Sequence, residues 1–455
     1  MRKMLLFSCV MFVASGWLYS QIFVQPGEGT LHQALADASD GDVYQLAAGE
    51  TYIETGYEEF ADIIGKCITI EVEGDGSEKA IVKMQTEREE DETFVFFNLG
   101  DQGSVTLRGI EFDGELNGER SATYLITFTM GDEPTPILAK KIEIENCTVR
   151  NLMKSVLVSG NSDMKYNVVV DSTIMDNVII ENTGAVVYYK YGGANYISIT
   201  NSTFYNIYEY GFRISGPVES GLPDNTPTVV IDHTTWYKVG LNNDISGQRE
   251  MIQGEKGPLL NPWTVSNSIF VDQANKDRTF INIKDTPGDS NAVISGICFW
   301  DIGNVNFREH TVSDTLRMYT EFADPNNGDF TLPANSPLFS LGTGHKPIGD
   351  PRWYMGVYGI EDDGISIVKS FDLHQNYPNP FNPATRISFN LEKAGFTVLS
   401  VYDLTGKEVA KLVSENLGVG EYTYTFYSRN LSSGIYFYRL NSAGQTLTKK
   451  MMLIE

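Results

Sequence analysis

Short runs of β-branched and apolar residues recur along residues 106–301, each followed by a polar residue or glycine and then by further apolar or aromatic residues. Inside the runs apolar and polar positions alternate, which is the period of β-strands. The seven copies are 106–114, 142–151, 168–177, 197–206, 229–238, 263–272 and 292–301. Strand-and-turn repeats of this length predict a solenoid.

The spacing of the copies describes the coils of this solenoid. Aligned on the polar or glycine position, successive copies are 37, 25, 30, 32, 34 and 29 residues apart. Stacked coils pair strand on strand at about 4.8 Å. The unequal steps predict loops of different length around a constant core. The aligned residues are Gly109, Asn146, Asp171, Asn201, His233, Asn267 and Gly296.

Two of the recurring positions predict rows of stacked side chains. Asn146, Asn201 and Asn267 indicate a structural row of amides at one corner of the coil. An aromatic position about three residues later predicts an interior column rather than a sugar platform. Its members are Phe112, Phe204, Trp236, Phe270 and Phe299.

The two ends of the repeat region resemble a known superfamily. Leu31, Ala34, Leu35 and Ala38 share one helical face, followed by a stop at Gly41. This pattern resembles the N-terminal cap of right-handed parallel β-helix proteins of the pectate lyase superfamily, and residues 322–342 resemble the superfamily's closing coil. The resemblance implies a right-handed parallel β-helix (solenoid). The fold class that we expect is all-β, with a small antiparallel β-sandwich after the β-helix.

The C-terminal segment, 371–455, differs in its residue pattern from the repeat region before it. Short alternating strands are separated by glycine turns, which predicts the sandwich. The segments NYPNPFNP (376–383), VYDLTGKEV (401–409), GIYFYRL (434–440) and KKMMLIE (449–455) closely resemble the C-terminal sorting domain of type IX secretion cargo. The resemblance implies that the type IX secretion machinery is a partner and that the protein is secreted or held on the outer cell surface.

The N-terminal 20 residues read as a secretory signal peptide, with a basic start and a short apolar run. We therefore expect a signal peptide at 1–20, a β-helix with its helical cap at 21–360, a linker at 361–370 and the sorting domain at 371–455. No other stretch reaches the roughly 20 apolar residues of a membrane helix, so no transmembrane segment is expected in the mature chain.

The chain is acidic, with 34 Lys+Arg against 59 Asp+Glu and a formal charge of −25. Losing Arg2 and Lys3 with the signal peptide lowers this by two. Such a chain lacks the basic face that nucleic acid requires. An acidic ligand would need a local basic strip or a bridging cation. Cys67, Cys147 and Cys298 remain after cleavage, an odd number that predicts buried free thiols.

Lysis of a uronic-acid polymer requires a cation that neutralises the sugar carboxylate and a base that removes the C5 proton. We looked for such groups one coil apart. Lys190 and Arg213 lie 23 residues apart, each at the end of a strand-like run. We interpret Lys190 as the base and Arg213 as the carboxylate ligand or the partner of the base.

Other residues near this pair complete the expected polysaccharide site. Four tyrosines could stack on sugar rings, and two lysines could extend the basic strip: Tyr188, Tyr191, Tyr208, Tyr210, Lys154 and Lys238. Glu181 and Glu209 are the expected ligands if Ca²⁺ is a cofactor.

The pair resembles the chondroitinase-B-like polysaccharide lyases, which implies β-elimination on an acidic glycan. Those enzymes carry two glutamates just before the lysine, whereas NTGAVVYY (182–189) has none. Three alternatives stay open: a solvated surface pair, a hydrolase using corner carboxylates such as Asp171 and Asp176, and a non-catalytic carbohydrate-binding or adhesin-like surface protein.

Overall fold

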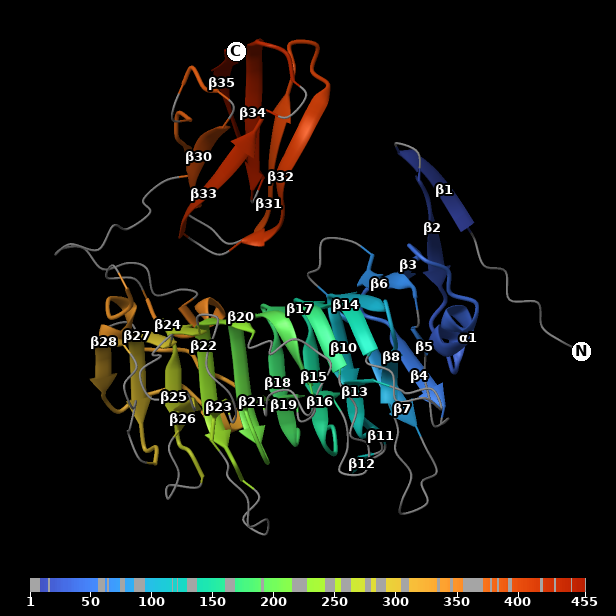
Figure 1. Ribbon diagram of the computed structural model, residues 1–455, viewed down its shortest axis with the longest axis vertical. Coiled ribbons are helices and arrows are strands. Elements are labelled where there is room, and N and C mark those ends of the chain that lie inside the picture. The colour runs from blue at the N-terminus through green and yellow to red at the C-terminus, as the bar shows by residue number, and fades with distance from the viewer. Residues whose placement is uncertain are drawn as a thin grey trace, which may run out of the picture. The chain divides into compact units, whose positions relative to one another are not determined.

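The structure is a computed structural model, and it divides the chain into two compact units, 1–357 and 358–455 (Figure 1). It describes every residue except 1–8, 15–16, 56–61, 64, 74–77, 86–94, 117, 121, 129–136, 160–167, 190–191, 215–226, 242–249, 255–262, 275–279, 284–291, 304–310, 334–335, 344–346, 355–370, 377–378, 383, 392–394, 418–419, 429–430, 443 and 455. The expected linker, 361–370, lies outside the described residues.

The first unit is the expected parallel β-helix, whose coils carry strands on three faces. The first face holds β3 (Val43–Leu46), β6 (Cys67–Val72), β9 (Ser104–Arg108), β14 (Ile137–Glu145), β17 (Val168–Asp176) and β24 (Trp263–Ser266). The second holds β4 (Thr51–Thr55), β7 (Ala80–Gln85), β10 (Ile110–Asp113), β15 (Thr148–Arg150), β18 (Ile179–Glu181) and β25 (Ile269–Val271). Four described strands bend across both faces: β20 (Gly192–Ile207), β22 (Thr228–Val239), β27 (Ala292–Trp300) and β28 (Thr311–Arg317).

The third face is a separate eight-stranded parallel sheet. Its strands are β5 (Asp62–Ile63), β8 (Val95–Leu99), β13 (Tyr124–Thr127), β16 (Ser155–Ser159), β19 (Ala185–Tyr189), β21 (Phe212–Ile214), β23 (Ile252–Gly254) and β26 (Ile281–Ile283). A short hairpin, β11 (Glu115–Leu116) with β12 (Glu119–Arg120), precedes β13.

The corner between the first two faces is made by residues in the left-handed backbone region. Asn146, Asn201 and Asn267 have φ of 51°, 49° and 45° there, as the repeat alignment expected for a corner row. Asparagine tolerates this region better than most residues because its short side chain bonds locally. The expected member Asp171 is wrong: Glu145 pairs with Asp176, so the corner residue of that coil is Asn177, with φ 55°.

The core fills the space between the three faces. Phe204, Trp236, Phe270 and Phe299 share one register position, and the Phe204 and Trp236 ring centroids are 4.2 Å apart. The five predicted aromatics are all buried, which confirms the interior column. Trp236 and Phe270 stack with an interplanar angle of 9°.

The cysteines are free thiols, as expected. Cys147 lies in the main core, whereas Cys298 is buried on the outer side of the second face and Cys67 is partly exposed. Burial raises the pKa of the Cys147 and Cys298 thiols to about 11. Both groups therefore stay protonated and unreactive near neutral pH.

The predicted cap helix is α1 (Thr30–Ala36), which buries Leu31, Ala34 and Leu35 against the first coil. The buried carboxylate of Glu54 accepts hydrogen bonds from the backbone N–H groups of Leu31 and His32, both at 3.1 Å. These contacts satisfy donors that the first turn of a helix leaves open. Before the helix, β1 (Cys9–Ala14) and β2 (Trp17–Val24) form an antiparallel pair; the signal peptide stays a prediction.

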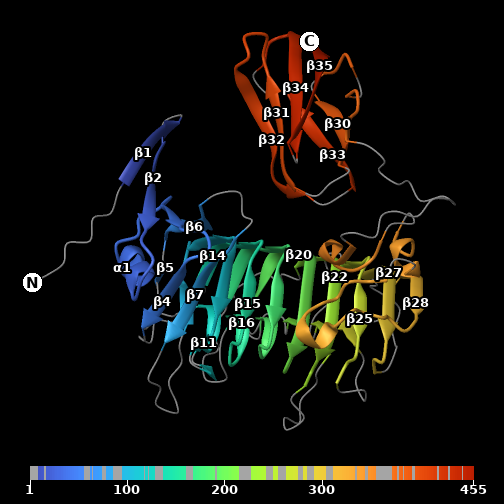
Figure 2. The same ribbon diagram turned by 180° about the vertical axis from the view of Figure 1, so that it is seen from behind.

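Residues 318–354 include the segment expected to form the closing coil, 322–342, but their described part has no strand that extends the parallel ladder. They contain three short 3₁₀ helices, η1 (Pro325–Asn327), η2 (Pro337–Phe339) and η3 (Pro351–Tyr354), and they pack on the outside of the second face. Figure 2 shows this covering segment in orange across β22 and β25. Proline at the start of each 3₁₀ helix lacks the N–H that a ladder strand needs, which explains why the segment covers strands instead of extending them.

The second unit is the expected antiparallel sandwich. One sheet holds β29 (Asp372–Leu373), β30 (Ala384–Leu391) and β33 (Gly420–Tyr427); the other holds β31 (Gly395–Tyr402), β32 (Glu408–Leu417), β34 (Gly434–Ser442) and β35 (Gln445–Leu453). Asn376, inside the NYPNPFNP segment, is buried, and its backbone N–H donates to the Tyr438 hydroxyl at 2.9 Å. No helix in the described part of the chain is long and apolar enough to cross a membrane.

Candidate functional site

The outer surface of the third face carries the side chains that the sequence singled out. Val187 and Tyr189 of β19 are buried in the core, so the intervening Tyr188 projects outward. Tyr188 pairs in register with Arg213 of the next coil, which lies between the buried Phe212 and Ile214. Strand alternation therefore places Tyr188 and Arg213 side by side on the outside of the same sheet.

The Arg213 guanidinium lies over two neighbouring tyrosine rings. Its central carbon lies 5.0 Å from the centroid of the Tyr188 ring and 4.4 Å from that of Tyr210. The two ring centroids are 5.4 Å apart, at an interplanar angle of 38°. The negative faces of the rings favour the cation by about 0.5–1 kcal/mol each at a partly exposed site. Because the guanidinium stays charged in proteins, Arg213 is suited to bind a carboxylate and poorly suited to accept a proton.

A second cation lies on the same side of this sheet. Lys154 directly precedes β16 and is exposed, and its Nζ lies 5.7 Å from the centroid of the Tyr124 ring. Tyr124 packs with Val158, and Tyr188 packs against both. Burial and, to a smaller degree, the charge of Glu209 raise the pKa of Tyr124 to about 12, so its hydroxyl stays neutral near pH 7.

We call these six residues the tyrosine–cation cluster: Tyr124, Lys154, Tyr188, Glu209, Tyr210 and Arg213. Five of them were expected site residues, and the structure brings these five together. Tyr208 lies in the turn that leads into β21, where its backbone N–H donates to the Thr183 carbonyl at 2.9 Å. Lys190 and Tyr191 lie outside the described residues, so their roles stay predictions.

The structure separates two expected site residues from the cluster. Glu181 lies on the second face, where its carboxylate accepts a hydrogen bond from the Tyr205 hydroxyl and lies 3.8 Å from Arg150. Lys238 occupies a left-handed corner position, with φ 53°, and its ammonium bonds to Asn326 of the covering segment. Both side chains thus have partners away from the outer surface of the third face.

The expected Ca²⁺ pair is also divided by this arrangement. Glu209 lies in the turn entering the third face, and Glu181 is engaged on the second. The described residues contain no group of three or more His, Cys, Asp or Glu side chains with metal-site geometry. Because Ca²⁺ takes six to eight oxygen ligands, Glu209 with its tyrosine and cation neighbours does not fit a calcium site.

Sequence reasoning missed several residues on the third face. Tyr124 lies three coils before Tyr210, a separation that hides their relationship in the sequence. Beyond Arg213 the outward register continues through Gln253 and Asn282, and Asn282 donates to the buried carboxylate of Glu250 at 2.9 Å. A polar residue between apolar neighbours, as in MIQG (251–254) and FINI (280–283), is the signal that could have found them.

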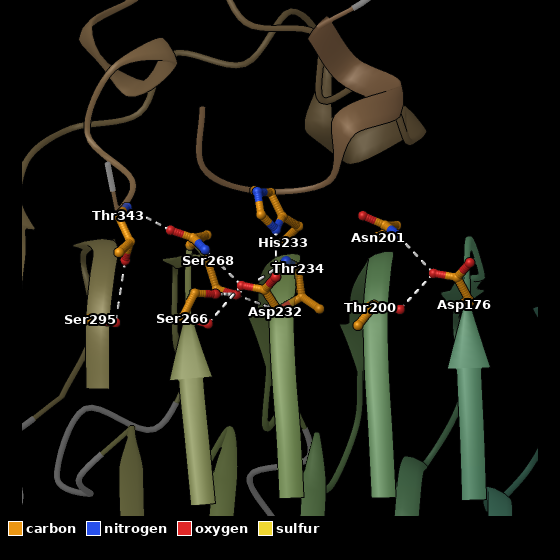
Figure 3. Close-up of polar contacts among 12 residues, drawn as sticks. Asp176, Thr200, Asn201, Asp232, His233, Thr234, Ser266, Ser268, Ser295 and Thr343 are labelled. Carbon is orange, nitrogen blue, oxygen red and sulfur yellow. Dashed lines mark hydrogen bonds and ion pairs between the residues drawn. The ribbon is translucent and has the colours of Figure 1, made fainter. Parts of the chain in front are cut away.

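Polar side chains also gather at the corner between the first two faces (Figure 3). Asp176 accepts from the Thr200 hydroxyl at 2.6 Å and from the Asn201 amide at 2.8 Å. The same arrangement recurs later along the corner, with Asp232, Ser266 and Asn267 at the same two distances. Each aspartate carboxylate thus accepts hydrogen bonds from side chains of the next coil. These bonds connect adjacent coils, which gives the corner a structural role.

A carboxylate and an imidazole meet at this corner, but their contacts are also structural. His233 Nδ1 lies 2.7 Å from the second Asp232 oxygen. Burial disfavours the charged form, yet hydrogen bonds from His233, Ser266 and Asn267 lower the pKa of Asp232. The hydrolase alternative is also not supported, because its two carboxylates lie too far apart. Asp171 and Asp176 are five residues apart on β17, roughly 17 Å along the strand, where glycosidases need about 5–10 Å.

Three regions of the chain match known family models. Residues 375–455 match the secretion system C-terminal sorting domain. Residues 64–207 and 229–353 match two models described as domains of unknown function, DUF4957 and DUF5123. The C-terminal unit is therefore a type IX sorting domain, and the protein is delivered to the cell surface or secreted.

Solved structures with a similar fold include the PL6 family alginate lyase AlyGC and an arginine-to-alanine mutant of that enzyme. They are 18% and 19% identical to this chain, and both have a TM-score of 0.40. Each comparison covers 65% of this chain and 39% of the enzyme, so this chain spans about two fifths of the length of these structures. Among curated proteins, no sequence matches.

Proposed function

We propose that this secreted β-helix protein binds an acidic polysaccharide on the outer surface of its third face and cleaves it by β-elimination. The observation that supports this most directly is the Arg213 guanidinium over the adjacent Tyr188 and Tyr210 rings. A charged, partly exposed guanidinium held by aromatic neighbours is a preorganised ligand for a planar carboxylate.

In this reaction Arg213 binds the uronate carboxylate and withdraws charge from it. The C5 proton of that sugar becomes more acidic, and a base removes it. The proposed base is Lys190, 23 residues before Arg213 in the chain. The electron pair left at C5 forms the C4–C5 double bond as the bond to the 4-linked oxygen breaks, and that oxygen leaves as a hydroxyl after taking up a proton.

Tyr124 is a poor base near neutral pH, because its raised pKa keeps the hydroxyl protonated. Tyr188 and Tyr210 instead provide apolar ring area beside the cation, on which a sugar ring can stack. The contacts of Glu181 give no support for a calcium-bound carboxylate, so this mechanism assigns neutralisation of the uronate to Arg213 alone.

The competing function is non-catalytic binding of a glycan at the cell surface. The cluster supports it equally, since a guanidinium over two adjacent aromatic rings needs no base in order to bind a carboxylate. The two functions share Arg213 and differ only in the need for Lys190.

A screen of anionic polysaccharides separates them. The full-length protein and the variants Lys190→Ala, Arg213→Ala and Lys140→Ala are incubated with pectate, alginate and glycosaminoglycans, with and without Ca²⁺. Ultraviolet absorbance of the unsaturated product and binding are both recorded. Lysis requires product with the parent protein, loss with the first two variants and retention with Lys140→Ala, since Lys140 is exposed on the first face. Binding without product from any polymer leaves the binding function, and no binding overturns both.

A further inference from the structure

The last two strands of the sorting domain carry apolar side chains in adjacent positions of their outer face. β34 pairs with β35, and Ile435 lies directly opposite Met452. Both side chains point away from the core, because their neighbours Tyr436 and Met451 are buried in it. Ile435, Met452 and Ile454 are 36%, 43% and 46% exposed. Since opposite side chains on one face of a sheet are near neighbours, these residues form one exposed apolar surface.

Two aromatic rings and two cations extend this surface. Phe437 lies opposite Lys450 of β35 on one side and opposite Tyr402 of β31 on the other. The guanidinium carbon of the exposed Arg439 lies 5.0 Å from the centre of the Tyr402 ring. Aromatic residues, Met and Arg are the residue types enriched in protein interfaces. We call these seven residues the sorting-domain stripe: Tyr402, Ile435, Phe437, Arg439, Lys450, Met452 and Ile454.

The backbone edge beside the stripe is already occupied. The Phe381 N–H donates to the Met452 carbonyl at 2.9 Å, and the Phe381 carbonyl accepts from the Ile454 N–H at 3.1 Å. The Met452 N–H donates to the side-chain oxygen of Asn379 at 2.9 Å. These bonds fill the ladder positions of Met452 and Ile454, so a partner meets this surface through its side chains rather than by strand addition.

The charge of these two strands is opposite to that of the whole chain. β34 and β35 contain the cations Arg439, Lys449 and Lys450 and no Asp or Glu, whereas the chain has a formal charge of −25. Lys449 lies opposite the buried Tyr438 and therefore points to the other side of the sheet. Arg439 and Lys450 give the stripe a positive rim, which favours an acidic partner surface.

We propose that the sorting-domain stripe docks on a protein of the type IX secretion machinery, at a site with an apolar centre and acidic residues around it. The family match assigns residues 375–455 to sorting and names no face for recognition. An exposed apolar patch with a polar rim is typical of a protein-binding surface. A lipid surface fits less well, because each of the two rim cations would contribute only about 1 kcal/mol there. This inference is independent of glycan binding by the β-helix.

The test measures secretion of the full-length protein by a bacterium that carries the type IX machinery. The double variant Ile435→Thr/Met452→Gln makes the stripe polar with little change in side-chain size, and Lys450→Glu reverses a rim charge. The matched controls are Phe396→Gln and Lys411→Glu, which change an exposed apolar residue and an exposed lysine elsewhere in the same sheet. Intact protein is quantified in the periplasm and outside the cell, and the thermal midpoint of each purified protein reports its folding.

The double variant should lower the secreted fraction by about fivefold or more, and Lys450→Glu by about two- to fivefold, because each removes part of the docking contact. The missing protein should accumulate in the periplasm in folded form. Both controls should be secreted like the parent. Secretion of the double variant and of Lys450→Glu at the parent level overturns the inference.

Photocrosslinking identifies the partner without depending on the stability of a polar variant. A photoreactive phenylalanine analogue replaces Met452 or, as the control, Phe396, and adducts formed in secreting cells are identified by mass spectrometry. We expect an adduct with a component of the type IX machinery from position 452 and none from position 396. The inference is overturned by an adduct with lipid or with a second copy of this chain, by equal adducts from both positions, or by no adduct from position 452.

Discussion

Arg213 lies one coil after Tyr188 in the same register of the third face, and its guanidinium carbon is 5.0 Å from the centre of that tyrosine ring. The same carbon lies 4.4 Å from the centre of the Tyr210 ring. Two residues that are 25 positions apart in the chain thus form one binding element, because the coil returns each strand to the same place at each turn.

Loss of the Tyr188 ring should weaken binding through Arg213. Tyr188→Leu keeps apolar contact with Val158 but removes the aromatic face, and we expect affinity for an acidic oligosaccharide to fall about two- to fivefold. Tyr188→Phe keeps the ring and should bind like the parent. Tyr196→Leu, which changes an exposed tyrosine of the first face, is the control. Equal affinities for the Leu and Phe variants would contradict a role for the ring.

Removal of the Glu209 charge should strengthen the binding of acidic glycans. Glu209→Gln eliminates the negative charge next to Tyr124, and we expect a gain of about two- to threefold at low salt that disappears at high salt. The pKa of Tyr124, followed by its ultraviolet titration, should fall but stay above 10 because burial is the larger cause of its shift. An unchanged salt dependence would argue against the electrostatic role of Glu209.

The covering segment should make the stability of the β-helix depend on pH through Asp350. This carboxyl is fully buried and accepts a hydrogen bond from the Thr203 hydroxyl at 2.6 Å, and burial raises its pKa to about 6. The folded state therefore holds the proton more tightly than the unfolded state. Stability from this group is fully present below about pH 4, the ordinary pKa of Asp, and is lost as pH rises to about 6.

The matched measurement is the thermal midpoint of the β-helix transition at intervals from pH 4 to pH 7, for the parent and for Asp350→Asn. The loss in the parent over this range is up to roughly 2–3 kcal/mol, and the asparagine variant should lack this part of the pH dependence. Curves that run parallel for the two proteins would show that Asp350 does not titrate as expected.

The corner asparagines should be replaceable by glycine at a lower cost than by alanine. Asn201 has φ 49°, and its amide donates to Asp176 at 2.8 Å. Asn201→Gly loses the hydrogen bond, at about 1 kcal/mol. Asn201→Ala loses the bond and also forces an alanine into the left-handed region, at about 1–2 kcal/mol more. Chemical unfolding of both variants checks the order, which a structural corner requires.

Much of the fold could be predicted from local pattern. Alternating apolar positions and their recurrence predicted the coils, the aromatic column and the corner row, because each coil repeats the same burial at the same position. The register of one coil was the exception. The run VVVDSTIMDN (168–177) offers two polar positions, Asp171 and Asn177, and only the pairing of Glu145 with Asp176 decides between them.

The candidate site was predictable only in part. Tyr210 and Arg213 are close in the chain, so the sequence grouped them correctly. Glu181 and Glu209 have similar neighbours in the sequence, yet one turns toward Tyr205 on the second face and the other lies near Tyr124. The face on which a residue lies depends on the position at which the chain turns a corner of the coil. If that position moves by a few residues, the residue lies on a different face.

The sequence by itself determined the solenoid, its cap and the sorting domain, because these depend on side-chain periodicity and on local segments. Only the tertiary structure decided which cations share a surface, since Lys154 and Arg213 come together through the stacking of three coils and through aromatic contacts between residues far apart in the chain. It also decided where residues 318–354 lie. They pack across the second face because their prolines interrupt strand pairing.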